Sequence, residues 1–283
     1  MPELPEVETT RRALEARLSG ARIDRVEVRR RDLRRPVPAE LPELLAGRRL
    51  VGFGRRGKYL LVDTDGPVDL LVHLGMSGRL LLDAAADHPH AHVVLCFAGG
   101  RFLSFVDPRR FGLIEPLATG QAEGHPLLAG LGPEPLDPGF RGEVLRRAFA
   151  GRAAPVKNLL LDQRVVAGVG NIYACEALFE ARIHPFTPAG ELDGRACTRL
   201  ARAIRAVLER AIGAGGSSLR DYVAADGRLG NFQNDFRVYD RAGLPCPRCG
   251  TAVVREARAG RSTFFCPRCQ PERRPGVPSR DGR

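Results

Sequence analysis

The first twenty residues have the hydrophobic spacing of an amphipathic helix. Val7, Arg11, Leu14 and Leu18 recur at intervals of three or four positions, which places them on one face of a helix. Gly20 follows the last of these positions, and glycine commonly ends a helix because it adopts a left-handed backbone conformation at little cost. The pattern therefore predicts a short helix that ends near Gly20.

From residue 22 to about residue 117 the spacing changes to short runs typical of β-strands. The clearest runs cover residues 26–28, 59–62, 68–72, 92–97 and 101–105. Asp65-Gly66 and Gly99-Gly100 have the composition of hairpin turns between them. Several short strands at this spacing favour a sandwich or a barrel over a parallel sheet.

A stretch rich in glycine and proline, residues 130–139, predicts a linker, and beyond it the spacing becomes helical again. Helices are expected at residues 156–161, from Asn171 onwards with Asn171 as the N-cap, and at residues 200–211, ending at Gly213. The turn at residues 166–170 carries two glycines, which suits either close packing or the approach of a phosphate to a helix N-terminus. The long polar stretch at residues 213–237 has the composition of a functional loop.

Two cysteine pairs near the C-terminus have the spacing of a structural zinc site. Cys246 and Cys249 form one pair, Cys266 and Cys269 form the other, and residues 250–265 separate them. The intervening stretch predicts strands at residues 251–254 and 263–265 around a turn near residues 259–260, whose tip would carry Arg258 and Arg261. Two disulfides are the alternative, and they fit poorly in a chain without an evident export signal.

Composition favours a nucleic-acid partner and a cytoplasmic location. The 283 residues include 44 Lys and Arg against 33 Asp and Glu, a net charge of +11, which is the footprint of a phosphate-binding surface or simply of a basic protein. We expect no membrane span and no signal peptide, because no apolar run is long enough and the N-terminus is acidic. The remaining cysteines, Cys96, Cys175 and Cys197, are expected to be buried free thiols.

The N-terminal residues could carry covalent chemistry. Removal of Met1 would leave Pro2 with a secondary amine, and an α-amino group has a pKa near 8, so a useful fraction is unprotonated at neutral pH. Such an amine can attack a sugar C1′ and form an iminium, while Glu3 could protonate an oxygen beside it. The alternative is structural, because proline followed by glutamates also initiates helices.

Six motifs in fixed order resemble one family. They are residues 1–8 (MPELPEVE), 57–59 (GKY), 73–78 (HLGMSG), 107–112 (DPRRFG), 168–173 (GVGNIY) and the four-cysteine finger. Together they resemble bacterial formamidopyrimidine-DNA glycosylase, the 8-oxoguanine repair enzyme, from residue 1 to residue 270. The resemblance implies an α+β multidomain fold with an N-terminal helix and β-sandwich (1–130), a helix–two-turn–helix domain (131–238) with a lesion loop (214–230), a zinc-finger β-hairpin (239–270) and a basic disordered tail (271–283).

The resemblance also implies the chemistry: a bifunctional glycosylase and AP lyase that excises oxidised purines and then cuts the strand by β- and δ-elimination. Pro2 would be the nucleophile, Glu3 the general acid, Lys58 a proton-transfer residue, and Arg261 a phosphate contact that serves in δ-elimination. One Zn²⁺ would be structural, held by Cys246, Cys249, Cys266 and Cys269, with no catalytic metal and no organic cofactor. The partner would be double-stranded DNA with the lesion preferably opposite cytosine, bound by a monomer at the bacterial nucleoid.

The family's DNA contacts fall on residues that could otherwise be read as ordinary core or solvated positions. Met76, Arg109 and Phe111 would fill the space left by a flipped nucleotide, with Arg109 on the orphaned cytosine. The implied phosphate contacts are His90, Arg152, Lys157 and Asn171. Pro89 stands where many relatives have a basic residue, and Arg152 lies in a variable stretch. A metal pair of His90 and His92 is a further alternative.

Two other functions share part of these features. A related endonuclease VIII-type glycosylase would act on oxidised pyrimidines, but the N-terminal run and the set of Met76, Arg109 and Phe111 favour the purine enzyme. A non-catalytic zinc-ribbon protein would share the charge and the cysteines, yet it gives no role to the amine of Pro2.

Overall fold

The computed structural model describes residues 2–84, 87–218, 225, 230–258 and 260–272, and the chain divides into two compact units. The first unit comprises residues 1–131 and 209–234, and the second comprises residues 132–208 and 235–283. Up to residue 131, the helices and strands of the first unit are α1 (Leu4–Leu18), β1 (Ile23–Val28), α2 (Leu41–Leu45), β2 (Leu50–Arg56), β3 (Tyr59–Thr64), β4 (Val68–His73), β5 (Arg79–Leu82), β6 (Ala91–Phe97), β7 (Phe102–Val106) and β8 (Leu113–Ala118).

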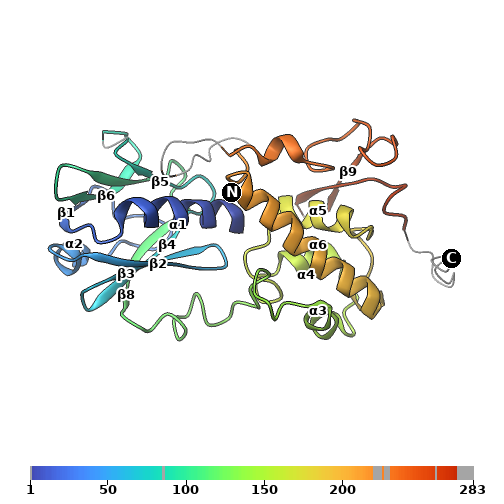
Figure 1. Ribbon diagram of the computed structural model, residues 1–283, viewed down its shortest axis with the longest axis horizontal. Coiled ribbons are helices and arrows are strands. Elements are labelled where there is room, and N and C mark those ends of the chain that lie inside the picture. The colour runs from blue at the N-terminus through green and yellow to red at the C-terminus, as the bar shows by residue number, and fades with distance from the viewer. Residues whose placement is uncertain (1, 85–86, 219–224, 226–229, 259, 273–283) are drawn as a thin grey trace. The chain divides into compact units, whose positions relative to one another are not determined.

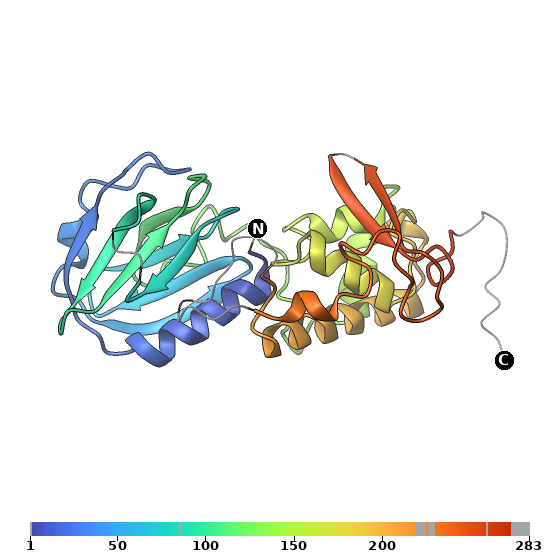
Figure 2. The same cartoon turned by 90° about the horizontal axis from the view of Figure 1, so that it is seen from above.

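The strands of the first unit form a β-sandwich, as expected. One antiparallel sheet has the order β1-β6-β7-β5 and the other has the order β2-β3-β4-β8 (Figures 1 and 2). A single buried cluster contains side chains of both sheets and of α1, including Leu14, Leu60 and Leu95. Burying each such side chain contributes about 1.5–3 kcal/mol, so this cluster holds the helix on the sandwich.

Backbone conformation confirms the predicted turn at Gly99–Gly100 and the helix end near Gly20. Gly99 and Gly100 both have positive φ angles in the tight connection between β6 and β7, where the Phe97 N–H donates to the carbonyl of Arg101 at 2.8 Å. Gly20, with φ of 76°, comes two residues after the last residue of α1. Cys96, Cys175 and Cys197 are buried free thiols, as expected.

The second unit contains helices followed by a two-stranded hairpin. Its elements are α3 (Gly142–Phe149), α4 (Val156–Leu161), α5 (Asn171–Glu180), η1 (Ala189–Glu191), the greater part of α6 (Gly194–Gly213), β9 (Val254–Arg258) and β10 (Arg261–Phe265), while η2 (Phe232–Asp235) spans the boundary of the two units. Helices α4 and α5, separated by turns at residues 162–170, form the expected helix–two-turn–helix. The hairpin of β9 and β10 projects from the helical part of this unit (Figure 2).

Two local predictions in this unit are wrong. Asn171 is not the N-cap of α5: the cap is Gly170, and the Asn171 side chain donates to the carbonyl of Ser262 instead. The first finger strand begins at residue 254 and not at residue 251. Thr251 accepts a hydrogen bond from the backbone of Cys246, and Val253 bonds residues 243 and 244, because this stretch folds back on the first cysteine knuckle before it pairs with β10.

Candidate functional site

The N-terminus of α1 places Pro2 and Glu3 in a buried, hydrogen-bonded setting. Pro2 is buried, and Glu3 is the N-cap residue with 2% of its surface exposed. The backbone N–H of Glu3 donates to Oε2 of Glu6 at 2.8 Å, one half of a capping box. The backbone at Glu3 is therefore fixed by a carboxylate one helical turn away, and the position of Pro2 is constrained with it.

Glu6 has a second role that the sequence did not reveal. Its Oε1 accepts hydrogen bonds from the backbone N–H of Ser217 at 2.8 Å and from the Ser217 hydroxyl at 3.1 Å. Gly216, with φ of 81°, precedes this contact, and a Cβ there would lie 3.1 Å from Oε1 of Glu6. One buried carboxylate thus joins the start of α1 to the segment after α6, where the expected lesion loop begins. Residues 219–224 and 226–229 of that loop lie outside the described residues.

Lys58 is buried in the turn between β2 and β3, in the same unit as Pro2 and Glu3. The pKa of His73 is lowered to about 4, chiefly by burial and further by the positive charges of Lys58 and Arg34. His73 is consequently neutral near pH 7, and its Nδ1 accepts the backbone N–H of Gly75 at 3.0 Å. The alternative of a solvated lysine at a strand start does not fit this burial.

Met76, Arg109 and Phe111 lie on two loops of the sandwich unit. Met76 is 40% exposed and Phe111 is 45% exposed, so neither is a core residue. The guanidinium of Arg109 lies over the Phe111 ring, with 4.9 Å between the guanidinium carbon and the ring centroid. An exposed apolar pair beside a stacked arginine has the composition of a wedge that can enter a base stack.

Three histidines occupy alternate positions, His88 and His90 just before β6 and His92 within it. The ring centroids of His88 and His90 are 5.5 Å apart, and those of His90 and His92 are 6.2 Å apart. The buried His92 ring contacts the carbonyl oxygen of Asp107 through Nε2 at 2.8 Å. Among the described residues, the four finger cysteines are the only group of three or more potential ligands close enough to share an ion, so the His90–His92 metal pair gains no support.

The predicted phosphate contacts of the second unit differ in exposure. Arg152 is exposed after α3. Lys157 on α4 is only 2% exposed, and its Nζ donates to the carbonyl of Ser262 at 3.1 Å and to the hydroxyl of Thr263 at 2.8 Å. Asn171 Nδ2 donates to the same Ser262 carbonyl at 3.0 Å. Side chains of α4 and α5 therefore both bind Ser262, the residue that follows Arg261.

Arg261 begins β10, directly opposite Arg258 of β9. Arg258 stacks on Phe186, with 3.7 Å between its guanidinium carbon and the ring centroid, and pairs with Glu256 at 3.1 Å. Both arginines and Lys157 line a pocket of about 310 Å³ within this unit. The Asp162 carboxylate also lines this pocket and pairs with Arg164 at 2.8 Å. The three cationic side chains outnumber it and favour an anion, and guanidinium groups suit phosphate geometry.

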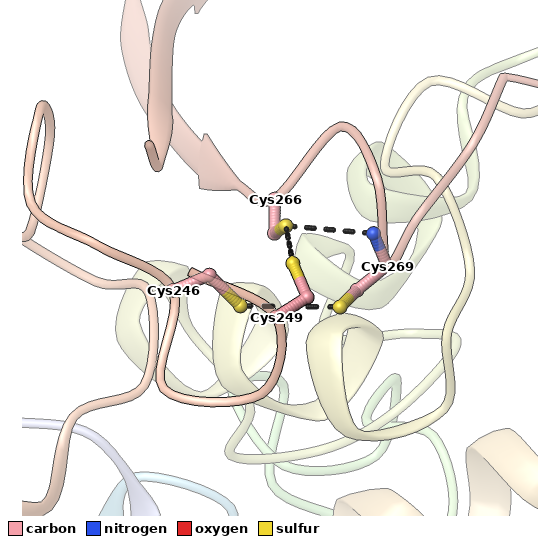
Figure 3. A group of neighbouring side chains, drawn as sticks. All are labelled: Cys246, Cys249, Cys266 and Cys269. Atoms are coloured by element: carbon pink, nitrogen blue, oxygen red, sulfur yellow. Dashed lines mark hydrogen bonds between the residues drawn. The ribbon is translucent and has the colours of Figure 1, made fainter. Parts of the chain in front are cut away.

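The four finger cysteines bring their sulfur atoms together in one cluster. Cys246 and Cys249 lie on one loop, Cys266 and Cys269 lie on the other, and their sulfur atoms point toward one another (Figure 3). The Sγ distances are 3.9 Å for Cys246–Cys269 and 3.5 Å for Cys249–Cys266, and all four atoms lie within 4.8 Å. A Zn–S length of about 2.3 Å implies S–S separations of about 3.8 Å in a tetrahedron, so the site fits zinc.

Glu176 anchors the chain that leads into the finger, a role the sequence did not indicate. This carboxylate of α5 accepts the backbone N–H groups of Arg237, Val238 and Tyr239 at 2.8–3.0 Å. Burial raises the pKa of Glu176, while the three donors oppose that rise. The anchoring contacts join residues more than sixty positions apart in sequence, so no local pattern could have revealed them.

Comparison with known families agrees with this geometry. Three family models match in order: the formamidopyrimidine-DNA glycosylase N-terminal domain (residues 1–114), the formamidopyrimidine-DNA glycosylase H2TH domain (131–223) and the zinc finger found in FPG and IleRS (243–271). The formamidopyrimidine-DNA glycosylase of Novosphingobium aromaticivorans is 55% identical over 270 residues, covering 95% of this chain and all of the relative. That of Cereibacter sphaeroides strain KD131 is 52% identical, with the same coverage.

Solved structures extend the comparison to DNA complexes. The MutM (Fpg) protein of Thermus thermophilus superposes with a TM-score of 0.87 at 46% identity, over 96% of this chain and all of that one. A Lactococcus lactis Fpg bound to DNA with an abasic site has a TM-score of 0.87 at 37% identity, over 95% and 100% of the two chains. The chain belongs to the formamidopyrimidine-DNA glycosylase family, whose members are DNA-repair glycosylases with a zinc finger. Among the described helices, none has the length and apolar character needed to cross a bilayer.

Proposed function

We propose that this protein is a bifunctional DNA glycosylase and AP lyase that removes oxidised purines from duplex DNA. The observation that carries the proposal is the N-terminus itself: a proline and a glutamate in a buried, hydrogen-bonded setting at the start of α1, in a chain of this family. Removal of Met1 leaves the nitrogen of Pro2 as a secondary amine. An amine of this kind is nucleophilic at neutral pH, because its pKa lies about two units below that of lysine.

The proposed reaction proceeds through a covalent link between Pro2 and the sugar. The nitrogen lone pair forms a bond to C1′ while the C1′–base bond breaks, its electron pair leaves with the base, and the Pro2 N–H proton is released. Glu3 supplies a proton to the sugar ring oxygen, which opens the ring and gives an iminium. The iminium acidifies the C2′ proton, whose loss expels the 3′ phosphate; a second elimination then expels the 5′ phosphate. Water finally hydrolyses the iminium, which releases the sugar remnant as an aldehyde and frees the amine of Pro2. Lys58 assists the proton transfers, and Arg261 holds the phosphates. No metal takes part in this chemistry.

DNA recognition in this proposal divides between wedge and phosphate contacts. Met76 and Phe111 fill the gap left by the flipped nucleotide, which costs a few kcal/mol of stacking and pairing to extrude. Arg109 hydrogen-bonds the orphaned cytosine, which gives the preference for lesions paired with C. His90, Arg152, Lys157 and Asn171 belong to the phosphate-binding surface, and the contribution of Lys157 passes through Ser262 beside Arg261.

The remaining parts of the proposal concern organisation. The division expected from the sequence, at residues 130, 238 and 270, is a functional one: catalytic domain, DNA-binding domain and finger. One zinc ion holds the finger, and the protein acts as a monomer on DNA at the bacterial nucleoid. The DNA complexes of the Lactococcus lactis relative, with Fapy-dG and with an abasic site, support a lesion-containing duplex as the partner.

Comparing two substrates tests this function. Duplexes carry either 8-oxoguanine opposite cytosine or thymine glycol opposite adenine, and excision is followed under single-turnover conditions. The proposal predicts faster excision of 8-oxoguanine and strand ends that carry phosphate on both sides of the gap. Preferential excision of thymine glycol would favour the endonuclease VIII-type activity. Binding without excision of either base would favour a non-catalytic DNA-binding protein.

A further inference from the structure

Within the sandwich unit, a fully buried carboxylate joins the two loops that carry Met76, Arg109 and Phe111. Asp107 has no exposed surface. Its Oδ1 accepts the hydroxyl of Ser77 at 2.7 Å, and its Oδ2 accepts the backbone N–H of Gly112 at 2.8 Å. The Asp107 side chain thus connects the loop after β4 to the residue before β8.

The backbone of Asp107 is fixed as well. Its N–H donates to the carbonyl of His90 at 3.0 Å, and its carbonyl contacts Nε2 of the buried His92 at 2.8 Å. Asp107 is therefore held by the start of β6 while its side chain holds the two loops. A charged acceptor in a buried site makes stronger hydrogen bonds than a neutral one, which gives these contacts weight.

Each of the three wedge residues lies directly beside a group in this network. Met76 precedes Ser77, and Phe111 precedes Gly112. The backbone N–H of Arg109 donates to the Ser77 hydroxyl oxygen at 3.2 Å. The Ser77 hydroxyl therefore donates to one loop residue and accepts from another, so it fixes the backbone at Met76 and at Arg109 together.

Close backbone packing leaves the two loops little freedom. Gly75 has φ of 64°, and a Cβ there would lie 2.4 Å from the carbonyl carbon of Phe111. A Cβ at Gly112 would lie 2.8 Å from the carbonyl oxygen of His73. The two loops pack backbone against backbone at Gly75 and Gly112, which have no side chain. The hydrogen bond between Asp107 and Ser77 holds the loops at that separation.

We propose that Asp107 and Ser77 are positioning residues for duplex opening: they hold Met76, Arg109 and Phe111 as one rigid wedge. This inference rests on the proposed function, because it assigns a role in extruding the base and none in the bond-breaking steps. If the loops were flexible, inserting the wedge between base pairs would cost the conformational entropy of ordering them. In a preorganised wedge that entropy cost has already been met on folding.

Ser77→Ala tests the inference, and Ser104→Ala is its matched control. Ser77→Ala removes the hydroxyl that both donates to Asp107 and accepts from Arg109. Ser104 is also a buried serine of the same sandwich, but its hydroxyl has no hydrogen-bond partner among the described residues. The two variants lose the same atom at similar burial, and only one loses the connection between the loops.

The measurement compares two substrates under single-turnover conditions. One is 8-oxoguanine opposite cytosine in an intact duplex; the other is a preformed abasic site, where no base has to be unpaired. The fraction of active protein is counted by borohydride trapping on the abasic duplex. We expect Ser77→Ala to slow excision from the intact duplex by about tenfold, as the loss of two hydrogen bonds implies, and to change abasic-site cleavage by less than about twofold. Ser104→Ala should leave both rates near wild type.

Placing the lesion in an unpaired bubble provides a second readout, and we expect it to restore the Ser77→Ala rate. Should Ser77→Ala prove too unstable to assay, Asp107→Asn keeps the side-chain shape, removes the charge, and should show the same split between substrates. Equal slowing on both substrates, or behaviour like Ser104→Ala, would overturn the inference while leaving the proposed function intact. Absence of 8-oxoguanine excision by the wild-type protein would overturn the proposed function itself, and this inference with it.

Discussion

Lys157 provides the most informative single substitution, because its buried ammonium contacts the strand that begins with Arg261. Replacing it with methionine keeps a chain of similar length but removes the bonds to the Ser262 carbonyl and the Thr263 hydroxyl. A hydrogen bond from a charged donor contributes about 1.5–3 kcal/mol. Removing the buried charge also removes its desolvation cost, which offsets part of the lost hydrogen-bond free energy. We therefore expect Lys157→Met to lower the free energy of unfolding by about 1–3 kcal/mol.

The functional consequence should appear in strand cleavage. Asn171 still donates to the Ser262 carbonyl in the variant, so this carbonyl keeps one of the two side-chain hydrogen bonds described above. We expect cleavage at an abasic site to fall by about tenfold, a loss of about 1.4 kcal/mol in transition-state stabilisation, while the zinc content stays at one equivalent. Arg199→Met, at an exposed position of α6 that does not line the pocket of Lys157 and Arg261, is the control and should leave both the free energy of unfolding and the cleavage rate near wild type.

A double-mutant cycle with Arg261→Ala decides how Lys157 acts. If Lys157 works by holding Arg261, its substitution should have little further effect on cleavage once Arg261 is removed, since the two losses share one interaction. If Lys157 instead contacts a DNA phosphate independently, the losses should add, and each should lower the salt dependence of binding by about 0.9 in the log–log slope. Additive losses would refute the positioning role.

Two further predictions concern the finger and the sandwich. Cys266→Ala should abolish stoichiometric zinc binding, measured by metal analysis. It should also lower the affinity for abasic duplex at least about tenfold, because structural zinc supplies folding free energy to such modules. Unchanged DNA affinity in a zinc-free variant would contradict this prediction. The pKa of His73 is lowered to about 4, so the unfolded chain gains a proton between pH 6.5 and 4 that the folded chain does not. The free energy of unfolding should therefore fall by up to about 3 kcal/mol as the pH drops through that window. His73→Gln should reduce this difference, measured by urea titrations at pH 5 and 7. An unchanged difference between the two pH values would exclude His73 as the cause.

Local patterns in the sequence predicted most of the elements. The period-two runs identified strands of both sheets, and the cysteine spacing identified the finger, because burial on one face and metal geometry both leave short-range signals. Gly20 and the pair Gly99–Gly100 marked their turns correctly because the backbone there requires positive φ angles.

The sequence failed where long-range contacts decide the role of a polar residue. Asn171 was expected to cap its own helix, yet its side chain contacts Ser262, ninety-one positions away. Lys157 contacts Thr263 across 106 positions, and Glu6 contacts Ser217 across 211. Periodicity carries no information on such pairs. The roles of Pro2, Glu3, Lys58 and Arg261 came from the family resemblance and stay predictions.

The residue that becomes covalently attached to DNA distinguishes catalysis by Pro2 from catalysis by another amine. Wild-type protein is incubated with an 8-oxoguanine:C duplex and sodium borohydride, and the trapped complex is digested and analysed by mass spectrometry. The proposed mechanism predicts an adduct on an N-terminal peptide that lacks Met1, with the deoxyribose remnant on the nitrogen of Pro2, and no adduct when Met1 is retained. Attachment at a lysine, or trapping that is unaffected by retained Met1, would contradict the central role of Pro2.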